Sequence, residues 1–161
     1  MCENDRHPFS EAIAAAFLAA GEAAARGEVP VGAAVLDPGG ALLAVAGNRV
    51  EALGDPSAHA ELLAMRDAAA RLGQSRDRRL RLSGCTVVVT LEPCPMCAAA
   101  MEHFRVARVV FGAYDPKGGG VAHGPRLFER TGCLHRPEVI GGVREREAAH
   151  LLRAFFTRLR D

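Results

Sequence analysis

The stretch Thr86-Val87-Val88-Val89-Thr90-Leu91-Glu92-Pro93-Cys94-Pro95-Met96-Cys97 combines a strand pattern, a turn and the start of a helix. Its first five residues are all β-branched, which is typical of a strand buried on both faces. Pro95 suits the first position of a helix, because proline lacks only an N–H group that would be unpaired there. Cys94 and Cys97 then lie one helical turn apart on one face, so both sulfur atoms can reach a single atom. The stretch predicts a buried strand that leads into a helix with two thiols at its N-terminus.

Strand and helix patterns alternate on both sides of this stretch. An alanine-rich segment over residues 10–26 is followed by Gly27 and predicts a first helix. Two short apolar runs separated by Pro38-Gly39-Gly40 predict a hairpin. The expected elements are helices over residues 10–26, 55–72, 95–104 and 144–160, and strands over residues 31–36, 42–46, 86–90 and 106–111. This order predicts an α/β fold with three layers, in which a mixed sheet is covered by helices on both faces.

The composition is that of an ordinary globular protein. The chain has 161 residues, of which 49% are hydrophobic and 24% are charged. No repeat, low-complexity tract or linker divides it, so we expect a single domain over residues 1–161. The longest charge-free run near the N-terminus, residues 12–21, is too short to cross a bilayer, and the acidic residues before it do not suit a signal peptide. We therefore expect a cytoplasmic protein with no membrane partner.

The five cysteines do not suggest a disulfide framework, because their number is odd and their spacing is irregular. Cys2, Cys85 and Cys133 are interpreted as thiols without a function. The pair Cys94 and Cys97, taken alone, fits a zinc site and a disulfide-exchange site equally well. Two buried apolar side chains are a third interpretation.

A zinc ion needs four ligands, of which a catalytic site leaves one to water, so two thiolates require one further protein ligand. The candidate lies in Ser57-Ala58-His59-Ala60-Glu61, at the start of the second predicted helix. On a helix, His59 and Glu61 diverge by about 200°, so both reach one site only if the helix directs its N-terminal end at that site. The turn residues Asp55-Pro56 just before them fit such an entry. Taken alone, His59 reads as a hydrogen-bonded side chain and Glu61 as a solvated charge.

Together the two segments match a recurring pattern. His-x-Glu before one helix and Pro-Cys-x-x-Cys before another form the zinc deaminase signature, in which the glutamate is an acid/base group and not a ligand. We therefore predict that His59, Cys94 and Cys97 bind one zinc ion per chain and that Glu61 is catalytic. Disulfide exchange gives no role to His59 or Glu61, and a non-catalytic zinc or RNA-binding module gives none to Glu61. The other histidines lack ligand spacing and are interpreted as surface or core residues: His7, His103, His123, His135 and His150.

A resemblance to a known family extends over nearly the whole chain. It is carried by the segments Glu28-Val29-Pro30-Val31-Gly32-Ala33, Gly47-Asn48-Arg49, Ala58-His59-Ala60-Glu61, Val89-Thr90-Leu91-Glu92-Pro93-Cys94, Met96-Cys97-Ala98, Arg108-Val109-Val110-Phe111-Gly112-Ala113 and Phe155-Phe156. With these segments the chain resembles the bacterial tRNA-specific adenosine deaminases of the cytidine deaminase superfamily. The resemblance implies a five-stranded sheet of the cytidine deaminase type, a homodimer, and a zinc-dependent hydrolase that converts the wobble adenosine of a tRNA to inosine. It also implies that Asn48 and Val31 line the base pocket and that Asp115 contacts the substrate. Two features depart from the family: Tyr114 stands where its members often carry a polar or basic residue, and the loop over residues 116–125 varies among them.

The implied chemistry gives each residue of the motif a role. Zinc lowers the pKa of a bound water toward neutrality. Glu61 takes a proton from that water, delivers it to N1 of the purine, and later helps the C6 amine leave as ammonia. The N-termini of the two helices help to stabilise the developing negative charge. A deaminase of a free base or nucleoside, such as guanine or cytosine, shares the zinc motif and is the alternative.

Contacts with a tRNA anticodon stem-loop need a local concentration of positive charge, because the net charge of the chain is only +1. The last predicted helix carries an apolar stripe that we expect to face the core, which leaves Arg158 near the flank and Arg160 on the far side. A solvated helix end, whose arginines complement the helix dipole, fits equally well. The resemblance favours RNA binding, because the family uses this C-terminal region on the anticodon stem-loop.

Overall fold

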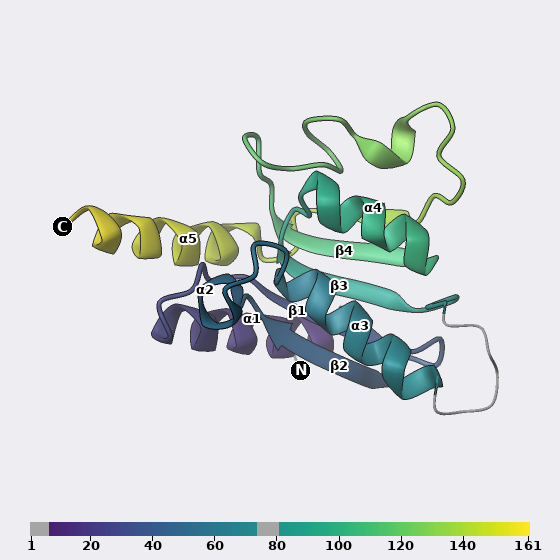
Figure 1. Ribbon diagram of the computed structural model, residues 1–161, viewed down its shortest axis with the longest axis horizontal. Helices are drawn as coiled ribbons and strands as arrows, with labels where there is room; N and C mark the ends of the chain where they lie inside the picture. The colour runs from purple at the N-terminus through teal and green to yellow at the C-terminus, as the bar shows by residue number, and fades with distance from the viewer. Residues whose placement is uncertain (1–6, 74–80) are drawn as a thin grey trace, which may run out of the picture.

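The computed structural model describes residues 7–73 and 81–161 of the chain (Figure 1). The elements follow one another as α1 (Ser10–Ala25), β1 (Gly32–Leu36), β2 (Leu42–Gly47), α2 (Val50–Leu53), α3 (Ala60–Gly73), β3 (Thr86–Leu91), α4 (Pro95–Phe104), β4 (Arg108–Ala113), the 3-10 turn η1 (Leu127–Glu129), β5 (Glu138–Ile140) and α5 (Glu145–Arg160). Cys2 lies outside the described residues. In the two described ranges, no helix is long and apolar enough to span a membrane.

The longer helices and strands that the sequence predicts are present, with shifts at their ends. The second long helix begins at Ala60 and not near residue 55, because Asp55 holds a turn there. Its Oδ1 accepts hydrogen bonds from the backbone N–H and the hydroxyl of Ser57 at 2.8 and 2.7 Å. β4 begins at Arg108, two residues later than predicted, because Arg105 ends α4 in the left-handed conformation with φ 60°. No pattern in the sequence predicts the short elements α2, η1 and β5 individually.

The five strands form one mixed sheet in the order β2-β1-β3-β4-β5. β1 is antiparallel to both β2 and β3, whereas β3, β4 and β5 are parallel to one another. In the centre of the sheet, Val89 of β3 pairs with Ala33 of β1 on one side and Phe111 of β4 on the other. The parallel pair β3 and β4 is connected by α4, as a parallel crossover requires. The mixed five-stranded sheet is therefore confirmed.

Alternate residues of the central strands face two different layers of helices. Val87 and Val89 belong to the core that includes residues of α3 and α4, whereas Val88 belongs to the core on the α1 side. α5 contacts α1, β3 and β4, so it shares that second layer (Figure 1). The approach of α1 to β1 is close, since a Cβ atom at Gly32 would lie only 1.9 Å from the carbonyl oxygen of Ala16. The three-layer arrangement predicted from the order of elements is confirmed.

One edge of the sheet collects the residues that the sequence motifs single out. β3 and β4 run parallel and both end at this edge. β1 is antiparallel to β3 and therefore starts here, just after Val31, while β2 ends here, just before Asn48. The starts of α3 and α4 meet at the same edge, because His59 and Cys94 lie next to each other there. Ligand sites of open α/β sheets are found at the carboxyl ends of parallel strands, which is this position.

Candidate active site

His59 lies within reach of both motif cysteines, although the three residues come from different parts of the chain. Its ring Nδ1 is 3.6 Å from Cys94 Sγ and 3.6 Å from Cys97 Sγ. His59 directly precedes α3, Cys94 is the residue before α4, and Cys97 lies in the first turn of α4. Within residues 7–73 and 81–161, these side chains form a group whose three ligand atoms all lie within 4.8 Å of one another.

The spacing of these atoms fits a tetrahedral zinc ion. Zinc binds an imidazole nitrogen at about 2.0–2.1 Å and a thiolate sulfur at about 2.3 Å, and a tetrahedral angle then separates the two atoms by about 3.6 Å. Both distances from His59 have this value. Three protein ligands leave the fourth position to water, which is the arrangement of a catalytic rather than a structural zinc site.

The surroundings of the two thiols favour a thiolate at Cys94. A hydrogen bond from Cys97 lowers the pKa of Cys94 to about 4; burial opposes this shift and the His59 ring adds to it. The same hydrogen bond raises the pKa of Cys97, and burial raises it further. Contact with Cys94 raises the pKa of His59. The protons shared by this group are those that a zinc ion would displace, because metal ligands must be deprotonated.

Glu61 lies in the first turn of α3, and its side chain is 4% exposed. Burial raises the pKa of its carboxyl group to about 7, although its own backbone N–H opposes the shift. A carboxyl group with a pKa near neutrality can both accept and donate a proton at physiological pH. The angle of about 200° expected between His59 and Glu61 on a helix does not apply here, because His59 lies before the first residue of α3. Both residues line the same cavity.

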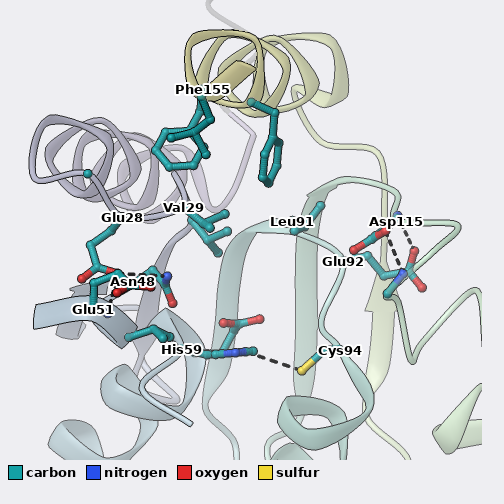
Figure 2. A pocket seen from close by; sticks show the side chains of 17 residues that line it. Glu28, Val29, Asn48, Glu51, His59, Leu91, Glu92, Cys94, Asp115 and Phe155 are labelled. Carbon is teal, nitrogen blue, oxygen red and sulfur yellow. Dashed lines mark hydrogen bonds between the residues drawn. The ribbon is translucent and has the colours of Figure 1, made fainter. Parts of the chain in front are cut away.

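This cavity has a volume of about 510 Å³. In Figure 2, His59 and Cys94 lie at its floor, Glu28 and Asn48 on one side, Glu92 and Asp115 on the other, and Phe155 of α5 above. The rest of its lining is largely apolar and includes Val29, Val31, Val50, Leu91, Phe156 and Leu159. Apolar walls with a few convergent polar groups suit a planar and partly polar ligand.

Asn48 and Val31 both line this cavity. Asn48 directly follows β2 and is buried, and its Nδ2 donates a hydrogen bond to Glu28 Oε2 at 3.4 Å. The buried Glu28 carboxylate also accepts the backbone N–H groups of Glu51 and Ala52, at 3.2 and 2.8 Å. Glu28 therefore fixes the orientation of the Asn48 amide and holds the start of α2 against the cavity.

Asp115 follows β4 and lines the cavity on the side opposite Asn48 (Figure 2). Its Oδ1 accepts hydrogen bonds from the backbone N–H groups of Lys117 and Gly118, at 3.1 and 2.9 Å. The carboxylate thus shapes the loop that it belongs to. Gly118 from the same loop also lines the cavity.

Comparison with known proteins places this site in a family. The cytidine and deoxycytidylate deaminase zinc-binding region matches residues 8–113 of the chain. The chain belongs to this deaminase family. The match includes His59, Glu61, Cys94 and Cys97. It confirms the predicted cytidine deaminase-like fold and, together with the ligand geometry, the predicted zinc cofactor.

Two of the proteins that this chain is similar to are tRNA deaminases. The chain is 47% identical over 142 residues to the tRNA-specific adenosine deaminase of Agrobacterium fabrum, and the match covers 88% of this chain and 89% of that protein. A solved structure from a study of A-to-I editing by tRNA:A34 deaminases at the wobble position of transfer RNA has a TM-score of 0.83 and 43% identity. That match covers 89% of this chain and 99% of the other. The guanine deaminase of Bacillus subtilis is less similar, with a TM-score of 0.58 and 33% identity over 65% of this chain and 63% of the other.

Sequence reasoning missed two carboxylates that organise the deaminase cavity. Glu28 and Glu92 are each 1% exposed, and both accept hydrogen bonds from backbone N–H groups. Their one signal in the sequence is a charged residue beside an apolar segment, as in Gly27-Glu28-Val29 and Leu91-Glu92-Pro93. Such a charge is ordinarily read as a solvated turn residue, so the signal is weak.

The prediction that the apolar stripe of α5 faces the core holds for only part of the helix and is wrong for its last turns. Phe155 is buried, whereas Phe156 and Leu159 are 44% and 66% exposed and line the cavity. Figure 1 shows the reason, since α5 extends past the ends of the strands and its last turns have no sheet beneath them. Arg158 and Arg160 are exposed at this end of α5 and do not line the cavity.

Proposed function

We propose that this deaminase converts the wobble adenosine of a tRNA to inosine, so that adenosine and water give inosine and ammonia. One observation carries the proposal: Glu61, a buried carboxyl group that the metal site does not need as a ligand, lines the same cavity as His59 and Cys94. A structural zinc site has no use for such a group. The likeness to tRNA adenosine deaminases over nearly the whole chain supports a tRNA adenosine as the substrate.

The proposed chemistry assigns the metal and the protons to different residues. His59, Cys94 and Cys97 would hold the zinc ion, which would supply an activated water at neutral pH. Glu61 would accept one proton from this water and deliver it to N1 of the adenine while the water oxygen bonds to C6. Glu61 would then take the second proton from that oxygen and pass it to the C6 amino group, so that the C6–N bond breaks and ammonia leaves. A pKa of about 7 suits a group that must gain and lose a proton in one turnover. The N-terminal ends of α3 and α4 meet at the cavity floor and favour negative charge there.

The walls of the cavity are proposed to hold the adenine. Val31 and Leu91 offer apolar surface to the faces of the base, and Asn48 offers its amide to the edge. An adenosine in an RNA loop must leave its stack to enter such a cavity. Phe156 and Leu159 at the mouth are exposed and offer apolar surface to the nucleotides beside it.

The remaining partners belong to the same proposal. The tRNA anticodon stem-loop is the proposed partner, with Arg158 and Arg160 as phosphate contacts beside the mouth and Asp115 as part of the substrate wall. A homodimer follows from the resemblance to the family. A cytoplasmic location follows from a tRNA substrate.

The test is to incubate the zinc-loaded protein with a transcribed anticodon stem-loop that carries adenosine at the wobble position. Nucleosides from the digested RNA are then separated, and inosine is quantified by mass spectrometry. Parallel reactions with free guanine, cytosine, cytidine and adenosine are assayed for ammonia. Inosine in the stem-loop with no ammonia from the free compounds supports the proposal. Ammonia from free guanine without inosine in RNA would establish the alternative, a deaminase of a free base.

A further inference from the structure

Glu92 is a buried carboxylate that the proposed chemistry does not use, and a whole loop is closed around it. Its Oε2 accepts the backbone N–H of Asp115 at 2.9 Å. Its Oε1 accepts the backbone N–H groups of Val121, Ala122 and His123 at 3.3, 2.8 and 2.9 Å. The ring Nδ1 of His123 lies 2.9 Å from Oε2 and donates a fifth hydrogen bond. The two ends of the loop over residues 115–123 are therefore held by one side chain.

These five donors account for the burial of the charge. All five donors are N–H groups within 3.3 Å of the two carboxylate oxygens. An ionised carboxylate only accepts hydrogen bonds and so satisfies all five donors, and each hydrogen bond to it is charge-assisted. Removal of the charge would leave several buried N–H groups without an acceptor, which is costly inside a protein. The loop conformation thus depends on this carboxylate as well as on the hydrogen bonds that Asp115 accepts within the loop.

The same loop is pressed against the turn that carries the zinc ligand Cys94. The backbone N–H of Gly120 donates to the carbonyl of Pro93 at 2.8 Å. A Cβ atom at Gly120 would lie 2.6 Å from the nitrogen of Pro95, and one at Gly119 would lie 2.4 Å from Glu92 Oε1. At Gly120 the loop backbone therefore meets the backbone of the turn, and at Gly119 it meets the Glu92 carboxylate, so neither position has room for a side chain. The loop over residues 115–123 and the turn that carries Cys94 therefore form one packed unit.

The other side of this unit faces the substrate cavity. Asp115 and Gly118 line the cavity, on the side opposite Asn48 (Figure 2). We propose that Glu92 is a positioning residue of the deaminase. It fixes the loop over residues 115–123 as the cavity wall that faces Asn48, and it keeps this loop at a fixed position relative to the turn that carries Cys94. The His123 ring donates the last of the hydrogen bonds that Glu92 accepts. The proposal rests on the proposed function for the identity of the substrate, a nucleotide of an RNA loop. Glu92 itself lines the cavity beside Asp115, but its two oxygens are already occupied by these five donors, so it acts on how the nucleotide is held.

The first variant is Glu92→Gln, which keeps the shape of the side chain but replaces one acceptor oxygen with a donor. The amide nitrogen then meets N–H groups, and at least one of them loses its partner. We expect KM for the stem-loop to rise about tenfold or more, as one unpaired buried donor implies, while kcat changes by less than about threefold. Zinc content should stay at one ion per chain. Backbone amides of residues 115 and 121–123 should exchange faster with deuterium.

Glu102 provides a matched control, because it is a second buried glutamate that holds a loop. It accepts the backbone N–H of Leu134 at 2.9 Å and Arg130 Nη2 at 2.6 Å, and it does not line the cavity. Glu102→Gln should lower the thermal midpoint as Glu92→Gln does, because it unpairs similar groups. Its KM should stay at the wild-type value. An equal rise of KM in both variants would overturn the proposal, because it would reduce the effect to general loss of stability.

His123 provides a second test that holds even if Glu92→Gln fails to fold. His123→Ala removes the fifth donor, whereas His123→Asn places an amide N–H close to the position of Nδ1. We expect His123→Ala to raise KM about threefold to tenfold and His123→Asn to restore it, since a single hydrogen bond to a charged group is at stake. Equal KM values for the alanine and wild-type proteins would overturn the proposal. Hydrogen exchange of the loop amides requires no substrate, so it tests the role of Glu92 independently of the proposed function. Rapid exchange of these amides in the wild-type protein would overturn the role of Glu92, whether or not the protein forms inosine.

Discussion

Replacing Glu61 with glutamine removes a proton-carrying group from the cavity floor and keeps its shape. Among the carboxylates that line the cavity, Glu28, Glu92 and Asp115 are each occupied by backbone N–H groups, and Glu51 is exposed on α2 rather than buried at the cavity floor. We therefore expect kcat to fall by about 10²- to 10⁴-fold, which is the loss typical of a missing acid/base group. This corresponds to about 3–5 kcal/mol of transition-state stabilisation. Folding should not suffer, because burial disfavours the ionised form of Glu61 and glutamine is neutral.

The assay is single-turnover inosine formation in the stem-loop with excess zinc-loaded protein, so that product release does not mask the chemical step. Zinc content by atomic emission and stem-loop binding by fluorescence anisotropy should match the wild type. Asp67→Asn is the matched control, since Asp67 lies on the same helix but its side chain is 46% exposed and pairs with Arg71. Its rate should equal the wild-type rate. A Glu61→Gln rate within tenfold of wild type, or loss of its zinc, would refute the assignment of Glu61 to proton transfer.

Four further predictions concern the zinc ligands, the RNA contacts, the homodimer and the hydrogen bonds that Glu28 makes beside Asn48. Purified protein should contain about one zinc per chain, and Cys94→Ser or Cys97→Ser should lose it; full retention in both variants would contradict the ligand assignment. Arg158→Glu with Arg160→Glu should weaken stem-loop binding and lower the slope of log K against log salt by about one for each lost phosphate contact, with zinc content unchanged; an unchanged slope would exclude this patch. Light scattering at micromolar concentration should give the mass of a dimer, and a monomer mass would disprove the proposed assembly. Glu28→Ala should lower the free energy of unfolding by about 1–3 kcal/mol, because it unpairs the Asn48 amide and two backbone N–H groups; an unchanged urea midpoint would show that these contacts contribute little.

The parts of the site that could be predicted from the sequence are those that depend on local rules. A helix starting at a proline places Cys94 and Cys97 on one face wherever the helix lies, and His59 with Glu61 marks the start of another helix. Their meeting at 3.6 Å was then implied by the zinc signature. The single domain over residues 1–161 stays a prediction.

The parts that could not be predicted depend on the backbone in three dimensions. Glu28 and Glu92 bind N–H groups 23 to 31 residues away in the chain, and no spacing rule identifies a backbone donor in advance. The two exposed apolar residues of α5, Phe156 and Leu159, follow the helical period of a buried stripe. Only the length of the neighbouring strands shows that they pass the end of the sheet.

The position of the metal ligands also affects how the chain folds. The zinc ligand His59 is separated from Cys94 by 35 positions and from Cys97 by 38. A bond that closes a loop of this length reduces the entropy of the unfolded chain by an amount worth roughly 4 kcal/mol on the loop-closure relation used for disulfides, and a metal clip acts in the same sense. Zinc therefore serves this protein as a reversible cross-link, and its unfolding temperature should rise with the concentration of free zinc. A shortage of zinc would therefore increase the fraction of unfolded chains, which is the form that proteases attack.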